Sequence, residues 1–145
     1  RIDPVEFGWT NIAGYADYGC RDMTLRKDAG RYECGTLNTI SIYGLRAAIE
    51  FLLRVGVERI GPDVLAATQR LAEGAQSKGY EVMGTRSPEH ASGIISIRKP
   101  GTDYRVTMNH LRRHQVTAAP RLGWVRLSPH FYVSPASIET VIDLL

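Results

Sequence analysis

The spacing of apolar residues changes several times along the chain, and the order of these changes limits the possible folds more than any other feature. Between residues 41 and 54, apolar side chains recur at the intervals of an amphipathic helix, and Gly56 then supplies a stop signal. A second helix is expected from Pro62 to Gly79. Proline is tolerated at the first helical position but costs roughly 3 kcal/mol in a helix interior.

The second half of the chain alternates short β-prone segments with helical ones. In chain order they are strands at residues 80–83 and 93–98, a helix at 103–114, strands at 116–119 and 124–127, and a last helix that Ser134 caps and Pro135 opens. The order ααββαββα predicts an α+β fold, in which helices cover a small, largely antiparallel sheet.

Length and composition indicate one globular domain. The 145 residues are enough for a single hydrophobic core, and 43% hydrophobic with 23% charged residues is ordinary for such a domain. No apolar run reaches the length of a membrane span, so no membrane partner is expected. Residues 1–30 show neither helical nor strand periodicity, which favours loop and extended backbone.

The charged and thiol groups argue against several function classes. A net charge of +3 is too small to indicate nucleic-acid binding. His110 and His114 have the spacing of two metal ligands, but arginines lie between them and no acidic residue or Cys follows in a suitable place, so no metal site is expected. Cys20 and Cys34 do not make a disulfide framework, and free thiols favour a cytoplasmic protein.

Two places are candidates for ligand binding. Residues 31–38 read Arg-Tyr-Glu-Cys-Gly-Thr-Leu-Asn and lead into the first helix, where Gly35 and Thr36 suit a phosphate. The same pattern also fits a simple turn and cap. Arg126 lies between Val and Leu in a strand, where its guanidinium either faces solvent or is held for a ligand carboxylate. The residues themselves leave both alternatives open.

Three separated segments together resemble a known family. Residues 31–38 and 43–49 resemble the R-F-E-x-G-T-x-N … G-L-x-A-A-I signature of class V aminotransferases, which are pyridoxal-phosphate enzymes of fold type I. Residues 123–132 are similar to the G-x-V-R-x-S-x-H-x-Y segment of that family, and residues 4–9 to its P-x-x-x-G-W stretch. The segments occur in the family's order and span nearly the whole chain.

The resemblance implies a role for each matching residue. Thr36, with Gly35, would bind the phosphate of the pyridoxal 5′-phosphate held by the neighbouring subunit of a homodimer. Arg126 would bind the α-carboxylate of an amino-acid substrate. Asn38 and Trp9 match motif positions and are further candidates for cofactor binding.

The resemblance also implies that residues 31–145 form the carboxyl-terminal small domain and residues 1–30 its extended lead-in. The sequence opens without Met, so we expect an excised domain whose large domain, with the Schiff-base lysine, precedes Arg1. None of the three lysines Lys27, Lys78 and Lys99 matches that lysine, so no catalytic residue is expected in this chain, which alone should be inactive.

Two departures from the family pattern bear on the reaction. Desulfurases of the family carry a catalytic Cys between the later strands, whereas no Cys follows Cys34 here. Val133 stands where the family has Asn after Tyr132. The alternative to an enzyme is a non-catalytic α+β interaction domain that shares ancestry with the family.

Overall fold

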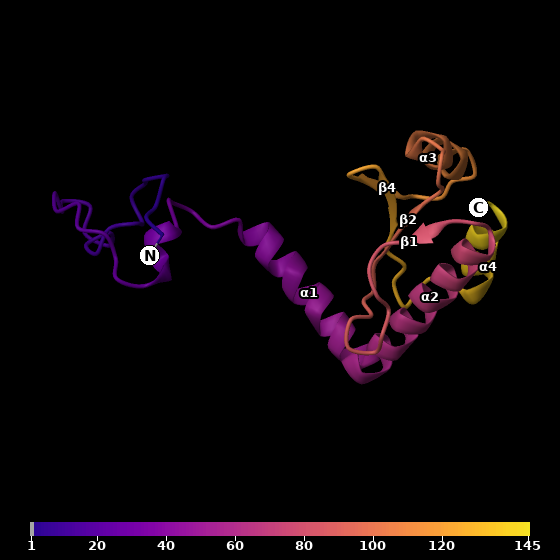
Figure 1. Ribbon diagram of the computed structural model, residues 1–145. Helices are drawn as coiled ribbons and strands as arrows, with labels where there is room; N and C mark the ends of the chain where they lie inside the picture. The colour runs from indigo at the N-terminus through magenta and orange to yellow at the C-terminus, as the bar shows by residue number, and fades with distance from the viewer. Residues whose placement is uncertain (1) are drawn as a thin grey trace. The chain divides into compact units, whose positions relative to one another are not determined.

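The computed structural model describes residues 2–145 and has the α+β architecture predicted from the sequence. Its contacts form two compact units, one ending at Phe51 and the other running from Leu52 to Leu145. The elements are a short 3-10 helix η1 (Ala29–Tyr32), α1 (Thr39–Val55), α2 (Val57–Ser77), β1 (Glu81–Val82), β2 (Ile95–Arg98), α3 (Tyr104–Arg113), β3 (Ala119–Arg121), β4 (Trp124–Leu127) and α4 (Pro135–Asp143) (Figure 1).

The first unit is mostly irregular up to η1, as the lack of periodicity predicted. An isolated antiparallel bridge joins Ile12 to Leu25, and the N–H of Ala13 donates to the carbonyl of Thr24 at 2.8 Å. Asp28 caps η1 by accepting from the N–H of Gly30. The structure groups residues 31–51 with this unit. The division into a lead-in of residues 1–30 and a small domain of residues 31–145 stays a prediction.

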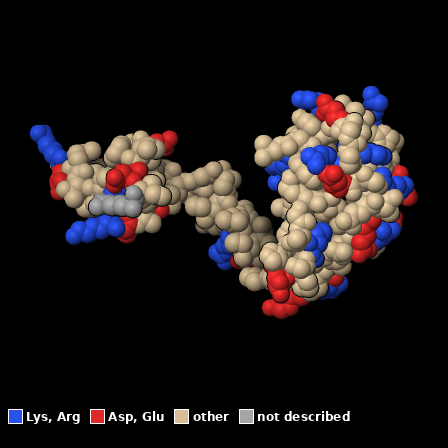
Figure 2. All heavy atoms as spheres, in the orientation of Figure 1, with Lys and Arg blue, Asp and Glu red and all other residues tan. Residues whose placement is uncertain are grey.

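Helix α1 forms where the sequence predicted it, yet it buries none of its residues. Leu45 and Leu53 are 62% and 64% exposed, and Ile42 and Ile49 are about half exposed. The side of the helix that Figure 2 shows is largely uncharged. An exposed apolar surface of this extent is typical of a contact with another chain or domain.

Helix α2 begins five residues before the expected start at Pro62. Gly56 breaks the chain with φ +95°, and the new helix starts at Val57, which places Pro62 inside it. The residue before a proline resists helical backbone mainly because its Cβ and N–H clash with the proline ring. Gly61 has no Cβ, which relieves part of that clash. At the other end, Gly79 has φ +81° and the N–H of Tyr80 donates to Ala75 at 2.9 Å, a Schellman motif.

The four strands form one antiparallel sheet in the order β1-β2-β4-β3. The first strand of the second hairpin was expected at residues 116–119 but lies at Ala119–Arg121. A two-residue turn causes the shift, because Leu122 and Gly123 both have positive φ, as a type I′ hairpin requires. Pro120 is therefore part of a strand, which is tolerated because β3 lies at the edge of the sheet.

The core of the second unit lies on one face of this sheet. Residues of β2 and β4 alternate between buried and partly exposed, and their buried side chains meet helices α2, α3 and α4. Figure 1 shows α2 and α4 side by side. The buried cluster comprises Leu71, Ala75, Tyr80, Ile95, Ile97, Leu111, Val125, Leu127, Ile138 and Ile142. Within residues 2–145, no helix is long and apolar enough to cross a membrane.

The contact between α2 and α4 depends on Gly74. A Cβ on Gly74 would lie 2.6 Å from the Cδ1 and Cγ1 atoms of Ile142. Gly→Ala in a helix normally stabilises by about 1 kcal/mol, whereas overpacking costs about 1–3 kcal/mol. We therefore expect Gly74→Ala to lower the free energy of unfolding, measured by urea denaturation. In an Ile142→Ala background the same change should be neutral or stabilising; a loss of equal size in both backgrounds would contradict this packing.

Candidate functional site

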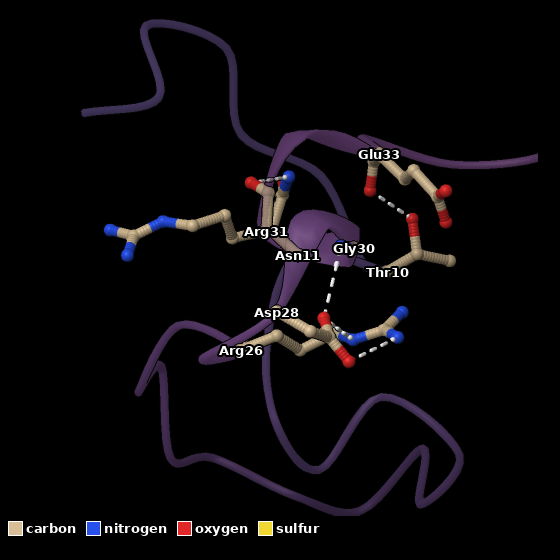
Figure 3. A network of polar contacts seen from close by, with 7 residues as sticks. All are labelled: Thr10, Asn11, Arg26, Asp28, Gly30, Arg31 and Glu33. Carbon is tan, nitrogen blue, oxygen red and sulfur yellow. Dashed lines mark hydrogen bonds and ion pairs between the residues drawn. The ribbon is translucent and has the colours of Figure 1, made fainter. Parts of the chain in front are cut away.

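The loop that carries Gly35 and Thr36 is held against residues 8–11 by polar contacts. Asn11 is fully buried, and its Nδ2 donates to the carbonyl of Arg31 at 2.8 Å. Its Oδ1 accepts from the N–H of Gly8, and the hydroxyl of Thr10 donates to the carbonyl of Glu33. Figure 3 shows Asn11 and Thr10 reaching the two ends of residues 31–33.

Close backbone packing continues this contact up to Gly35. A Cβ on Gly8 would lie 1.7 Å from the carbonyl oxygen of Cys34, so the two segments touch only because residue 8 is glycine. The indole of Trp9 lies against Gly35, with Nε1 3.5 Å from the position of a Cβ there. Trp9 and Gly35, which the sequence singled out separately, are therefore neighbours.

Thr36 follows this anchored segment and is free to meet a ligand. It is exposed, and its hydroxyl forms no hydrogen bond within residues 2–145. Asn38, in contrast to Thr36, already has a hydrogen bond. Its Oδ1 accepts from the N–H of Ser41 at 3.1 Å, which caps α1. The N–H of Thr39 donates to Leu37. The hydroxyl of Thr36 is thus a donor available to an anion, whereas the N–H groups of Thr39 and Ser41 at the start of α1 are already bonded.

An ion pair between Arg26 and Asp28 holds the segment that precedes this loop. The Arg26 guanidinium contacts both carboxylate oxygens of Asp28 at 3.0 Å, and the Asp28 carboxylate also accepts from the N–H of Gly30 at 2.9 Å. The hydrogen bond from Arg26, aided by that from Gly30, holds the pKa of Asp28 below its ordinary value. Asp28 therefore stays ionised, and η1 capped, throughout the neutral range.

Arg126 lies in β4, on the sheet face opposite the buried cluster. Its register partners are Ser96 on β2 and Ala119 on β3, both small. The Nε atom is buried without a hydrogen-bond partner, and no ion pair involves Arg126 within residues 2–145. A buried, unpaired guanidinium nitrogen is costly, so a carboxylate ligand would find a site ready for it.

The other arginine of β2 and β4 is already paired. Arg98 donates from Nε to the carboxylate of Glu81 at 3.0 Å and lies over the ring of Trp124, 4.5 Å from its centroid. Arg126 thus stands as the uncommitted cation of β2 and β4. Position in the strand alone did not distinguish these two arginines, whereas their partners do.

Three residues considered from the sequence remain, Val133, His110 and His114, together with His130. His130, which the sequence did not single out, has a buried Nδ1 without a partner and stacks on Tyr132 at 4.9 Å. It lines a cavity of about 380 Å³ between α2 and α4, as does Val133. His114 places Nδ1 3.0 Å from the carbonyl oxygen of His110 at the end of α3. Residues 2–145 contain no group of three or more potential metal ligands.

Comparison with known proteins shows the family of the chain. The family model described as aminotransferase class-V matches residues 2–121. The chain belongs to the class V aminotransferase family. A Bacillus subtilis relative, the uncharacterized aminotransferase YcbU, is 30% identical over 122 residues, which is 84% of this chain and 32% of the relative. A probable cysteine desulfurase of Pyrococcus abyssi is 26% identical over 79% of the chain and likewise 32% of its own length.

Two solved structures share the fold of this chain. The apo cysteine desulfurase of Thermococcus onnurineus NA1 matches 97% of the chain with a TM-score of 0.82 and 25% identity. A C-DES mutant with glycine covalently linked to its PLP cofactor matches 98% with a TM-score of 0.80 and 18% identity, which supports the fold alone. The chain spans about a third of the curated relatives and 38% and 37% of these structures.

The residues present fit the two groups that a pyridoxal-phosphate enzyme must hold. The unpaired Nε of Arg126 suits a carboxylate, and the exposed hydroxyl of Thr36, beside Gly35, suits a phosphate oxygen. None of these residues supplies a Schiff-base amine.

The lowered pKa of Asp28 leads to a pH prediction. Its contribution to holding η1 is present above its ordinary pKa of about 3.9 and is lost as the pH falls through the lower folded value. An NMR titration of the Gly30 amide proton should show a midpoint below 3.9. Arg26→Gln should raise that midpoint, and Asp28→Asn should abolish the transition. A midpoint of about 3.9 or higher would contradict the Arg26 contact.

Proposed function

We propose that the full-length protein is a pyridoxal-phosphate-dependent enzyme of class V that acts on an amino acid. The observation that carries this proposal is Arg126, the one arginine of β2 and β4 without a partner, whose buried Nε lacks a hydrogen bond. The match of the family model over residues 2–121 supports the family, although Arg126 lies beyond that match. A guanidinium held in a strand between small neighbours gives planar, bidentate recognition of an α-carboxylate.

In this proposal the protein residues bind and orient while the cofactor supplies the reactivity. When bound, pyridoxal phosphate acts as the electron sink for bond cleavage at the amino acid's α-carbon. Arg126 fixes the carboxylate, which restricts rotation of the substrate, and Thr36 donates its hydroxyl to a cofactor phosphate oxygen. Asn38 acts by capping α1, and Trp9 by covering Gly35.

The proposal includes a homodimer in which Thr36 serves the cofactor of the neighbouring subunit. The matches cover 32% of each of these two relatives, so most of the enzyme's surface lies outside this chain. The exposed apolar side chains of α1 are then covered by the remainder of the enzyme. The free thiols of Cys20 and Cys34 favour a cytoplasmic enzyme.

Among the reactions of the family, we favour one that needs no cysteine from this region. Residues 35–145 contain no Cys, so no thiol of β1 to α4 is available to accept sulfur from a substrate. The 30% identical relative is named an aminotransferase, whereas others are named probable cysteine desulfurases. Transamination, epimerisation and elimination are all compatible with the two binding groups described.

Substituting Arg126 tests the substrate site in the full-length enzyme. Arg126→Ala should weaken binding of amino acids by about 2–4 kcal/mol, because two charge-assisted hydrogen bonds are lost. The measurement is titration of the cofactor absorbance with a panel of amino acids and with the matching amines that lack the carboxylate. The amines should bind both proteins alike. Arg98→Gln removes the same charge from the same face and is the control.

An unchanged amino-acid affinity in Arg126→Ala would refute the assignment. Cofactor absorbance should persist in this variant. If the full-length protein binds no pyridoxal phosphate at all, the non-catalytic interaction domain becomes the better interpretation.

Substituting Thr36 tests the phosphate site separately. Thr36→Val keeps the size of the side chain and removes its hydroxyl, so affinity for pyridoxal phosphate should fall by about 1.5 kcal/mol, roughly tenfold. Affinity for pyridoxal, which lacks the phosphate, should stay the same. Equilibrium dialysis of the apoenzyme with each compound gives the two constants. A parallel loss for both compounds would place Thr36 away from the phosphate.

A further inference from the structure

We infer that Asn11 is a positioning residue for the loop of residues 31–36. It acts on Thr36 through the backbone of residues 31–33. This inference rests on the proposed role of Thr36. Asn11 is 0% exposed, whereas Thr36 and Glu33 on the loop it holds are exposed. A fully buried amide in an otherwise irregular unit needs a reason, because burying polar groups is unfavourable unless each is paired.

Both polar atoms of the Asn11 side chain are paired, and the residue links three separate backbone segments. Its Nδ2 donates to the carbonyl of Arg31 at 2.8 Å, and its Oδ1 accepts from the N–H of Gly8. Its own backbone carbonyl accepts from the N–H of Arg26 at 2.8 Å. One side chain thus ties the start of the loop to residues 8–11, and its main chain ties both to the segment before η1.

Other contacts hold the loop at more exposed positions. The hydroxyl of Tyr32 donates to the carbonyl of Ile2 at 2.6 Å, and Thr10 donates to the carbonyl of Glu33. The indole of Trp9 lies against Gly35. The contact of Gly8 with the carbonyl of Cys34 requires the two segments to stay in register. Since Asn11 binds both Gly8 and Arg31, it sets that register. Loss of the tie should let the hydroxyl of Thr36 move away from a phosphate oxygen.

Asn11→Asp is the most informative change, because it keeps the shape and the Oδ1 acceptor. The new carboxylate oxygen replaces the Nδ2 donor and faces the carbonyl of Arg31, so attraction becomes repulsion. Thr10→Val is a second, milder variant, which removes only the bond to Glu33 at a partly exposed site. Asp22→Ala is the control. Asp22 accepts from Thr24 in the same unit but does not contact the loop.

The experiment measures binding of pyridoxal phosphate and of pyridoxal to each full-length apoenzyme variant, together with the unfolding midpoint. Asn11→Asp should lower the affinity for pyridoxal phosphate about tenfold, as loss of the Thr36 contact would, and leave pyridoxal within twofold. Thr10→Val should shift the ratio of the two constants in the same direction by a smaller factor. Asp22→Ala should leave the ratio unchanged even where it lowers the unfolding midpoint.

The outcomes separate this inference from the proposed function. If Thr36→Val reduces the preference for the phosphate compound but Asn11→Asp and Thr10→Val do not, Asn11 is structural only and the inference is wrong. If Asn11→Asp fails to fold, Thr10→Val decides. An unchanged ratio of the affinities for pyridoxal phosphate and pyridoxal in that variant would contradict the inference. If Thr36→Val itself leaves the ratio unchanged, the proposed phosphate role fails first.

Discussion

The second unit depends on the alternation of side chains along β4, the strand between β2 and β3 in the middle of the sheet. Val125 and Leu127 face the helices and are almost fully buried, which directs Arg126 to the opposite face. A slip of one residue in the pairing with β2 would exchange these faces and place the guanidinium in the apolar core. The same hydrophobic contacts that stabilise the unit therefore orient its candidate substrate residue.

Much of the architecture could be predicted from the sequence, because most element ends carry local signals. Ser134 and Pro135 mark the start of α4, and Asp103 caps α3 by accepting from the N–H of Arg105. The early start of α2 could not be predicted from the proline rule, which ignores the missing Cβ of Gly61. The position of β3 also escaped local reasoning, because Leu122 adopts a positive φ that is uncommon for its type.

The candidate site was predictable only in part. Thr36 and Arg126 stand in motifs that resemble a family pattern. The family model matches residues 2–121, which include Thr36 and end before Arg126. No local pattern distinguishes Asn11, because its significance comes from contacts with Gly8 and Arg31, the second of which is 20 residues away. His130 lay within a quoted motif, but only the structure shows that its Nδ1 is buried and unpaired. Burial and pairing are tertiary properties that spacing does not reveal.

The two edges of the sheet have a consequence for assembly. β1 has two residues, and β3 has three, of which Pro120 has no backbone N–H to donate. Neither edge is long enough for another chain to extend the sheet by backbone pairing. Short edge strands and proline are known to reduce such edge-to-edge aggregation. Any contact that this sheet makes with another chain would therefore rely on side chains, so it would be sensitive to surface substitutions and tolerant of changes at the sheet margins.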